Sequence, residues 1–411
     1  MKINKAFKFR LYPNDQQIQF LAQSFGCARF VYNHFLLQRI YYYAETGKGL
    51  TYHDNALALT QLKKYPEFEW LKDISSQSLQ AALRNLDTAY NNFFNKRAEF
   101  PKFKKKSNKQ SFGVPQKFQI HDNLLDIPKC KGIKIKLHRD IEGVTKSITI
   151  SRTPSGKYFA SILCELDIPE PIYSGCEIGI DYGIKAFITT SDGKSIESPN
   201  YFRKSEKKLK KLQRSFSKKQ PNAKNQYKAQ KLLARQHEKV SNKRQDFLHK
   251  LSKQLISDNQ AIYIESLAIS NMIKLHTLAK SISDSGWNTF VNMLKYKGNW
   301  YGCRIIEIDR WFPSSKRCHV CGHMNDNLTL KDRSWLCTEC NTNHDIDINA
   351  AINILTFGRA SMAQTILPPL PAVAGTGTRN ACGEGSSFQM LSEISPSLKQ
   401  EAPFELRVQN G

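Results

Sequence analysis

The sequence predicts a multidomain protein of the α+β and α/β classes. A small β-barrel is split by an inserted helical block and is followed by an α/β sheet. Hydrophobic residues alternate with period two at the N-terminus and again between residues 111 and 166, whereas a helical period separates these two stretches. Short apolar runs that end in an acidic residue then alternate with helical patterns across residues 177–359.

The first strand is predicted within residues 5–12, where apolar side chains alternate with Lys8 and Arg10. Pro13 and Asn14 end this strand and begin a helical region. We assign residues 14–110 to a helical domain on the basis of three apolar stripes at helical spacing: Ile18, Leu21 and Phe25; residues 28–43; and Leu79, Leu83, Leu86, Tyr90 and Phe93.

A basic segment, Pro101–Ser107, follows the third stripe and surrounds Phe103 with lysines. Such a composition suits contact with a phosphate backbone and one stacked base. It also suits a solvated linker, and both interpretations stay open.

Strand periodicity returns between residues 111 and 166. Ile133, Ile135 and Leu137 alternate with lysines, and residues 154–156 read Pro-Ser-Gly, a hairpin turn. We therefore expect residues 1–13 and 111–170 to form one β-barrel that the helical domain interrupts. Basic barrel faces of this kind commonly bind nucleic acids.

The segment 171–360 predicts an α/β domain. Asp181 ends one apolar strand, Glu265 ends a later one, and Asp347 stands where an alanine- and isoleucine-rich helix begins. A further strand is expected at residues 303–308. Since the carboxyl ends of parallel strands meet at one edge of a sheet, the acids are expected to lie there together.

Residues 203–257 predict a basic helical insertion that breaks near Pro221. A Lys/Arg face along a phosphate backbone is one interpretation, and a solvated coiled arm is the other. The inward-facing residues are expected to be Leu209, Leu212, Phe216, Leu232, Leu233, Val240, Phe247, Leu248 and Leu251.

Two Cys-x-x-Cys pairs within the predicted ribbon 316–341 indicate a structural zinc site: Cys318, Cys321, Cys337 and Cys340. Two disulfides are the alternative, but the other six cysteines are scattered singly, and this favours a reducing compartment. Three nearby histidines could each replace a thiolate, although solvation or nucleic-acid contact suits them better: His319, His323 and His344.

Each of the three acids has an ordinary explanation, such as a helix cap or a surface ion pair. Asp181 and Glu265, however, directly follow apolar runs, where an unpaired charge is disfavoured. Converging carboxylates bind hard divalent cations, with Mg²⁺ the default for phosphate chemistry. Asp181, Glu265 and Asp347 are thus the predicted catalytic and Mg²⁺-binding residues of a two-metal site.

Composition points to the partner. The chain has 61 Lys+Arg against 36 Asp+Glu, a formal net charge of +25, and this imbalance favours a polyanion such as nucleic acid. No apolar run is long enough for a membrane span, and no amphipathic anchor supports a membrane surface. We expect a cytoplasmic protein, associated with the nucleoid when on DNA, with a disordered Pro- and Gly-rich tail at residues 361–411.

Several motifs in this order resemble the TnpB (OrfB) family of transposon-encoded proteins, which is related to type V CRISPR effector nucleases. The motifs are FKFRLYP at 7–13, FGCARFVYN at 25–33, GIDYG at 179–183, IESL at 264–267, FPSSKRC at 312–318, both Cys-x-x-Cys pairs, and DINAAINI at 347–354.

The resemblance implies a wedge-like β-barrel split by a helical recognition domain, then a RuvC-like (RNase H) nuclease interrupted by a zinc ribbon. It implies RNA-guided DNA cleavage next to a short adjacent motif, with a guide RNA from the transposon end and target double-stranded DNA as partners. We expect a monomeric ribonucleoprotein. The RuvC acids fall on Asp181, Glu265 and Asp347.

Two departures from the family pattern stand out. Ile346 occupies a position where the family usually has Arg, which removes a cation near the acids. Asn341 follows the last cysteine where Gly is common, and Asn tolerates a left-handed backbone. Asp345 is the alternative to Asp347 if the register differs by two. An inactive RNA-guided DNA-binding regulator and a transposase that acts without RNA are the competing functions.

Overall fold

The computed structural model describes residues 1–366 except for 108, 169–174, 273, 275–278 and 330–331. In this part of the chain, no helix has both the length and the apolar character needed to cross a bilayer.

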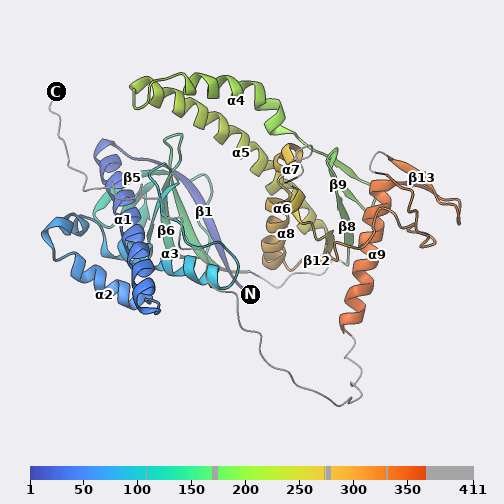
Figure 1. Cartoon of the computed structure of the whole chain (residues 1–411), viewed down its shortest axis with the longest axis horizontal. Coiled ribbons are helices and arrows are strands. Elements are labelled where there is room, and N and C mark those ends of the chain that lie inside the picture. Colours follow the sequence, from blue (N-terminus) through green and yellow to red (C-terminus); the bar gives the residue numbers. More distant parts are fainter. Residues whose placement is uncertain (108, 169–174, 273, 275–278, 330–331, 367–411) are drawn as a thin grey trace, which may run out of the picture. The chain divides into compact units, whose positions relative to one another are not determined.

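The first sheet has seven antiparallel strands in the order β2-β6-β7-β1-β5-β4-β3. Figure 1 labels β1, β5 and β6 of this sheet. Its first strand lies at the centre and pairs with β7 from Lys2↔Asp167 to Leu11↔Tyr158. The strands are β1 (Lys2–Tyr12), β2 (Gln110–Val114), β3 (Gln119–His121), β4 (Leu124–Ile127), β5 (Cys130–Lys136), β6 (Val144–Arg152) and β7 (Tyr158–Asp167).

The predicted alternation in β1 is confirmed, since Phe7, Phe9 and Leu11 are buried while Lys8 is exposed. The expected β-barrel is confirmed only in part among the described strands. β2 and β3 form the two edges and do not pair with each other, so the sheet is a curled half-barrel. A sheet closes into a barrel only if its two edge strands pair. The hydrophobic period of a single strand does not determine this pairing.

A helical block separates β1 from β2 in the chain. It comprises α1 (Asp15–Thr46), α2 (Tyr52–Leu62), the 3₁₀ helix η1 (Pro66–Asp73) and α3 (Ser76–Phe94). Asn14 caps α1 reciprocally with Gln17, and Gly47 ends the helix in the left-handed conformation at φ 68°. The block packs on the sheet through contacts such as Phe25 against Phe112, whose rings meet edge to face at 5.4 Å.

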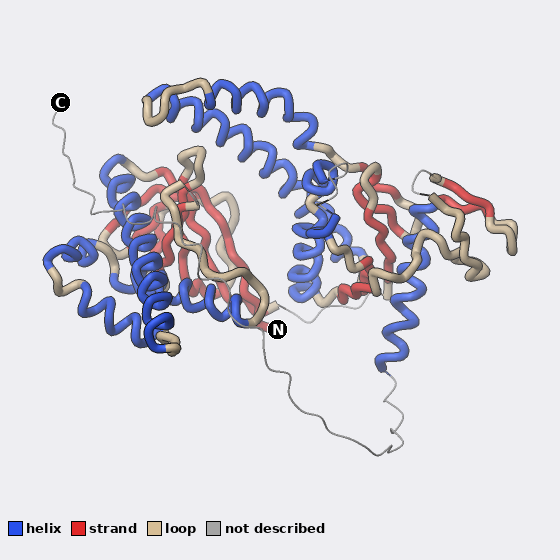
Figure 2. The backbone as a smooth tube through the Cα atoms, in the orientation of Figure 1, coloured by secondary structure: helices blue, strands red, loops and turns tan. Residues whose placement is uncertain are grey.

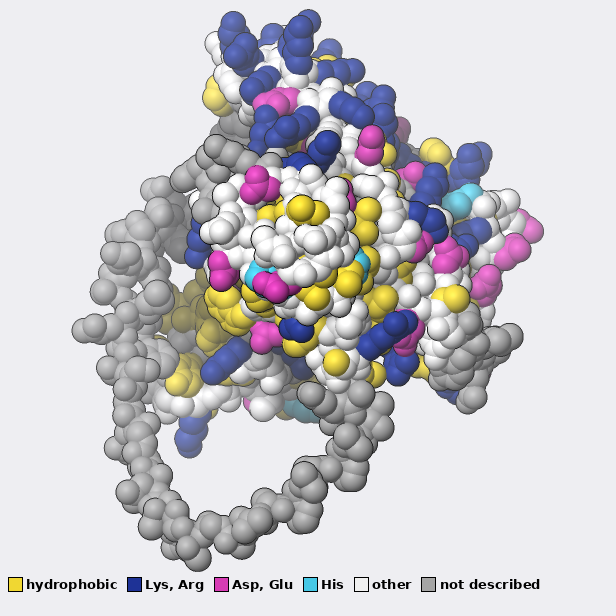
Figure 3. All heavy atoms as spheres, turned by 90° about the vertical axis from the view of Figure 1, so that its right-hand side faces the viewer, with side chains coloured by type: hydrophobic (Ala, Val, Ile, Leu, Met, Phe, Trp, Pro, Cys, Tyr) yellow, Lys and Arg dark blue, Asp and Glu magenta, His cyan; other side chains and the backbone are white. Residues whose placement is uncertain are grey.

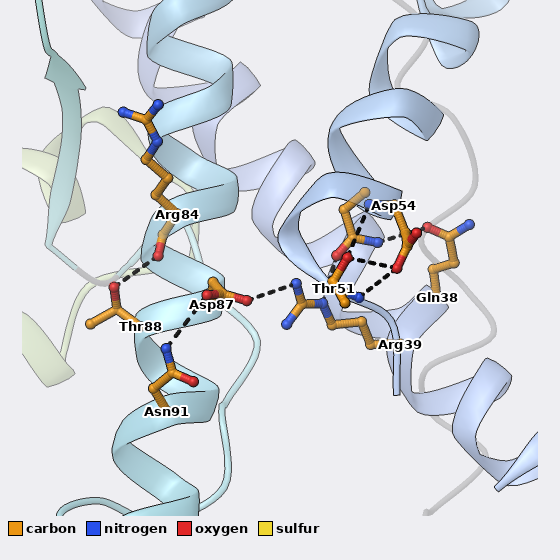
Figure 4. Close-up of polar contacts among 9 residues, drawn as sticks. Gln38, Arg39, Thr51, Asp54, Arg84, Asp87, Thr88 and Asn91 are labelled. Atoms are coloured by element: carbon orange, nitrogen blue, oxygen red, sulfur yellow. Dashed lines mark hydrogen bonds and ion pairs between the residues drawn. The ribbon is translucent and has the colours of Figure 1, made fainter. Parts of the chain in front are cut away.

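Arg39 of α1 joins three helices of this block (Figure 4). Its guanidinium is buried, donates to Asn55 at 2.6 Å and to Asp87 at 3.2 Å, and lies 5.1 Å from the ring centroid of Tyr90. A buried guanidinium needs such partners, because losing one leaves a desolvated charge unpaired.

The second sheet has the order β10-β9-β8-β11-β12, with β8, β11 and β12 parallel and β9 and β10 antiparallel. Its strands are β8 (Glu177–Tyr182), β9 (Ala186–Thr190), β10 (Ser195–Glu197), β11 (Ala261–Glu265) and β12 (Arg304–Ile308). The helices are α4 (Tyr201–Ser217), α5 (Lys224–Asp258), α6 (Ile269–Met272), α7 (Ala279–Ser285), α8 (Trp287–Tyr301) and α9 (Ile346–Ile366). A two-stranded ribbon pairs β13 (Ser334–Leu336) with β14 (Asn343–Asp345).

Helices cover both faces of this sheet (Figure 2). Ile180 and Ile262 belong to the core with α5 and α8, whereas Tyr263 belongs to the core with α9. Gly179 allows α9 to approach closely, since a Cβ there would lie 2.1 Å from the carbonyl oxygen of Ala351. The alternating sides of β8 and β11 therefore face different helices.

The basic insertion forms the predicted helical hairpin, α4 and α5, around a small core of its own. Leu209, Leu233 and Val240 are buried in this core. Leu232, expected to face inward, is instead 51% exposed, because adjacent helical residues diverge by about 100° and only Leu233 lies on the inner face.

Helix α9 extends beyond the expected end of the second domain at residue 360 and continues to Ile366. Met362, which falls within the predicted tail, packs against the core that contains Tyr263 and Ile354. The rest of the predicted disordered tail, residues 367–411, lies outside the described residues.

Candidate active site and metal centre

Four cysteine sulfurs converge as the sequence predicts. Among the residues described, Cys318, Cys321, Cys337 and Cys340 form the group of metal-ligating side chains whose donor atoms all lie within 4.8 Å of one another. The Cys318 and Cys340 sulfurs are 3.6 Å apart, and those of Cys321 and Cys337 are 3.5 Å apart.

These sulfur distances discriminate between the two alternatives. A disulfide requires about 2.05 Å, and the cysteines are free. Tetrahedral zinc with Zn–S bonds of about 2.3 Å places its ligands about 3.8 Å apart, close to the observed separations. The chemistry and geometry of this donor set fit structural zinc.

The three histidines near the cysteines differ in their surroundings. His344 is buried, packs beside Trp335, and places Nε2 3.1 Å from the sulfur of Cys318. The expectation of a solvated side chain is therefore wrong for His344. His323 lies at the edge of the cluster, 3.2 Å from the hydroxyl of Thr338.

Two buried amides, which the sequence analysis did not single out, tie α9 to the first cysteine pair. Asn349 accepts from the backbone N–H of His319 at 3.1 Å and donates to the carbonyl of Arg317 at 2.8 Å. Asn353 donates to the carbonyls of Ser314 and Arg317 at 2.8 and 2.6 Å. The signal in the sequence is two asparagines at i and i+4 on an otherwise apolar helix face.

Asp345 and Asp347 have different roles. Asp345 is exposed and caps α9, since its carboxylate accepts from the backbone N–H groups of Asp347 and Ile348, both at 3.0 Å. Asp347, two residues later, lies one turn before Ala351 on the helix face that Ala351 presents to the sheet. Asp347 therefore remains the candidate, and the alternative register is not needed.

Asp181 and Glu265 project from the sheet face that packs against α9. Asp181 has the same parity in β8 as Gly179, whose Cα faces α9, and Glu265 has the same parity in β11 as Tyr263. Both acids stand at the carboxyl ends of adjacent parallel strands, and both are half-buried. The first turn of α9 brings Asp347 to the same edge.

Electrostatic coupling links the three carboxylates. Burial raises the pKa of Asp181 well above its usual value, and the charges of Glu265 and Asp347 raise it further. Burial also raises the pKa of Glu265. When carboxyl groups are crowded and buried, their ionised forms are disfavoured unless a cation neutralises the charge.

Asp347 also lies near two cations. Burial and Asp345 raise the pKa of Asp347, whereas Arg333 and Lys185 lower it. Ile346, which occupies the family's usual arginine position, is buried with Cys318 in the ribbon core. A cation is thus present near Asp347, although it comes from elsewhere in the chain.

The carboxylates are less tightly clustered than the cysteines. In the chain as described, they do not form a second group of ligand atoms comparable to that of the four sulfurs. Asp181 and Glu265 share a sheet face, and the charges of Glu265 and Asp347 both act on Asp181, which suits a site that divalent cations would draw together.

Three family descriptions match the chain. Residues 161–276 match OrfB_IS605, described as "Probable transposase", and residues 287–354 match the Cas12f1-like TNB domain. Residues 1–48 match a helix-turn-helix domain of OrfB_IS605. Here those residues form β1 and the single long helix α1 rather than two helices.

Two relatives are similar over most of their length. A protein of Streptomyces pristinaespiralis, provisionally named an RNA-guided DNA endonuclease, is 40% identical over 407 residues, 97% of this chain and 96% of the relative. Escherichia coli InsQ, with the same provisional name, is 34% identical over 381 residues, 88% of this chain and 94% of the relative.

Among solved structures, the fold is similar to a chain of a Cas12f1–sgRNA–target DNA complex. The TM-score is 0.54 at 14% identity, over 86% of this chain and 98% of that chain. Identity and coverage of the curated relatives, together with the matched families, establish the relationship: the chain belongs to the TnpB (OrfB) family of transposon-encoded proteins.

Proposed function

We propose that this chain is an RNA-guided DNA endonuclease that hydrolyses target DNA beside a short adjacent motif at Asp181, Glu265 and Asp347. The observation that carries the proposal is the common sheet face of Asp181 and Glu265, which packs against the helix that carries Asp347, in a chain 40% identical to a provisionally named RNA-guided DNA endonuclease. The second sheet and its helices would then be the RuvC-like nuclease domain.

The three carboxylates would hold two Mg²⁺ ions. Mg²⁺ prefers hard oxygen ligands, and the cations would neutralise the crowded negative charge. When bound, such ions supply an activated water and neutralise the charge that develops on the leaving oxygen. Asp181 and Glu265 come from strands and are therefore rigidly placed, whereas the position of Asp347 depends on α9. Lys185 and Arg333 oppose the rise in the pKa of Asp347 that burial and Asp345 cause.

Zinc at the four cysteines would serve structure rather than chemistry. A four-thiolate site leaves no open position for substrate. The ribbon continues directly into α9, and Asn349 and Asn353 bind α9 to the segment before Cys318. Zinc would thereby hold Asp347 in place.

The partners would be a guide RNA derived from the transposon end and target double-stranded DNA. The hairpin of α4 and α5 presents Lys and Arg side chains outward, and these crowd the top of the view in Figure 3. A polyanion offsets the self-repulsion of a +25 chain. The curled first sheet and its helical block would form the wedge and recognition domains, in a ribonucleoprotein with one copy of the protein.

Cleavage of a guide-matched DNA duplex by the purified ribonucleoprotein tests this function. The wild type should cut the matched duplex in Mg²⁺ and leave a mismatched duplex intact. Asp181→Ala should abolish cutting while it retains the RNA. Normal cutting by this variant would refute the assignment of the site.

Sequencing of the RNA that copurifies separates the competing functions. One discrete species with a variable end supports guiding, whereas random cellular RNA or none supports a transposase that works without RNA. DNA occupancy without metal-dependent cleavage would instead indicate a regulator. Mass measurement of the particle tests the single copy of the protein.

A further inference from the structure

We propose that four aromatic side chains at the end of α3 form a platform on which an unpaired nucleobase stacks. This aromatic platform comprises Tyr90, Phe93, Phe94 and Phe100. The proposal rests on the proposed function, because it takes the partner to be a nucleic acid, but binding alone tests it.

The rings support one another. Phe100 meets Tyr90 and Phe93 edge to face, at centroid distances of 5.6 and 5.3 Å and interplanar angles of 85°. Phe94 lies 5.3 Å from Phe93 and is nearly parallel to Tyr90 at 6.2 Å and 27°. Two of the four rings nevertheless face water, since Phe94 is 70% and Phe100 44% exposed.

The chain that carries Phe100 is anchored at both ends. After α3, the N–H groups of Arg97 and Ala98 both donate to the carbonyl of Asn92, at 2.8 and 3.2 Å. Beyond the platform, the Asn33 amide donates to the Lys104 carbonyl at 2.9 Å and accepts from its N–H at 2.8 Å. The exposed rings are therefore preorganised, which lowers the entropic cost of binding.

These contacts also resolve the status of the basic segment 101–107. A free linker would not have its backbone paired to α1, and the ammonium of Lys104 lies 3.8 Å from the centroid of Tyr32. The segment is an ordered strap that presents Phe100 and leaves Lys105 and Lys106 exposed.

The surrounding charge identifies the occupant. Lys96 and Arg97 follow Phe94 within three residues and are both exposed. Aromatic rings interleaved with cations suit single-stranded nucleic acid, whose bases stack while its phosphates pair with the cations. An apolar protein surface or a second copy of this chain would have to desolvate those cations without compensation.

Binding of fluorescent single-stranded RNA and DNA of mixed sequence to the full-length protein provides the test. Phe94→Leu keeps an apolar side chain but loses the aromatic face, so affinity should fall about five- to tenfold. Phe94→Trp should bind at least as tightly as the wild type. Leu57→Ala is the matched control, because Leu57 is 71% exposed on α2 of the same helical block and should leave affinity unchanged.

An abasic oligonucleotide separates stacking from charge. It retains the phosphates, so Phe94→Leu and the wild type should bind it equally. With base-containing strands, the affinity loss of Phe94→Leu should persist at all salt concentrations, because no phosphate contact is removed. The RNA and DNA arms identify which strand uses the platform.

Three results would overturn the proposal. Phe94→Leu could bind base-containing strands as tightly as Leu57→Ala, or lose affinity equally for abasic strands. Light scattering could also show a self-association that Phe94→Leu abolishes without changing oligonucleotide affinity, which would assign the surface to a second copy. Failure of Asp181→Ala to stop cleavage would refute the nuclease site but leave these binding results standing.

Discussion

Asp345 and Asp347 show how two identical side chains, two residues apart, take different roles. The carboxylate of Asp345 accepts from the N–H groups that begin α9. Asp347 instead experiences the charges of Asp345, Arg333 and Lys185, and its own charge acts on Asp181. The local sequence alone does not distinguish them, because either could cap the helix.

Asp345→Ala and Asp347→Ala should therefore separate stability from cleavage. Loss of the Asp345 cap should lower the free energy of unfolding by about 1 kcal/mol and change cleavage by only a few-fold. Loss of Asp347 should lower the cleavage rate by a factor on the order of 10³, since a metal ligand is removed, with little loss of stability. Denaturant unfolding and single-turnover cleavage measure both effects, and the reverse ranking would contradict the assignment.

The raised pKa of Asp181 predicts a pH effect on stability in magnesium-free buffer. The folded state holds the Asp181 proton more tightly than the unfolded state, so this contribution is fully present below the ordinary pKa of about 3.9. It is lost as pH rises through the raised folded pKa. The free energy of unfolding should therefore fall with rising pH across this window, and less steeply in Asp181→Asn.

Added Mg²⁺ should oppose this loss in the wild type, because an ion that binds only the folded state stabilises it. Asp181→Asn should show little of this magnesium effect. If Mg²⁺ does not change the melting temperature of the wild type at pH 8, this result would argue against a cation site at Asp181.

Sequence predicted the candidate site from residues that follow apolar runs and from the spacing of the cysteines. It did not find Asn349, Asn353 or Arg333, because each acts through a partner that is close only in the folded chain. Arg333 influences Asp347 from fourteen positions upstream, across the ribbon that the four cysteines fold.

At the scale of elements, α9 is the connection between the zinc ribbon and the sheet. One face of the helix carries Asp347 and Ala351 toward β8, while Asn349 and Asn353 bind the segment before Cys318. The cysteine ribbon thus positions the first turn of α9, and this turn positions the carboxylate of Asp347.

Asn349→Ala should test this connection. The change leaves the backbone groups of Arg317 and His319 without the amide, at a cost of about 1–3 kcal/mol. Cleavage should fall ten- to hundredfold while the four thiolates still bind metal. The absorption spectrum of the cobalt-substituted protein checks the metal site, and unchanged cleavage would show that α9 is held by other contacts.

The basic hairpin makes a second prediction at this scale. Lys208 and Lys211 are exposed on α4, so replacing each with Ala should weaken RNA binding and lower the slope of log K against log salt by about 0.7. Lys250 is the matched control, because its ammonium pairs with Asp246 at 2.9 Å. Equal effects of all three changes would mean that the hairpin contributes only general charge.

Individual elements were predicted better than their assembly. The period of residues 5–12 identified β1, and the break near Pro221 located the hairpin. The β-barrel was predicted only in part, because closure depends on whether β2 and β3 pair. Helix α9 runs past the predicted domain end because Met362 packs against a core formed by distant residues.

At the scale of the whole molecule, the first sheet carries a helical block between its central strand and the edge strand β2, and the second carries a basic hairpin and a cysteine ribbon between its strands and α9. Both insertions in the second module lie between elements that hold the acids. Strands thus position Asp181 and Glu265. The hairpin provides a basic surface, and the ribbon supports the helix that carries Asp347.

The central claim is that Asp181, Glu265 and Asp347 share divalent cations. Anomalous diffraction from crystals of the ribonucleoprotein grown with Mn²⁺ in place of Mg²⁺ tests it most directly. The account predicts manganese peaks within coordination distance of oxygens from all three carboxylates. Manganese bound elsewhere, with these carboxylates uncoordinated and too far apart to reach a common ion, would contradict it.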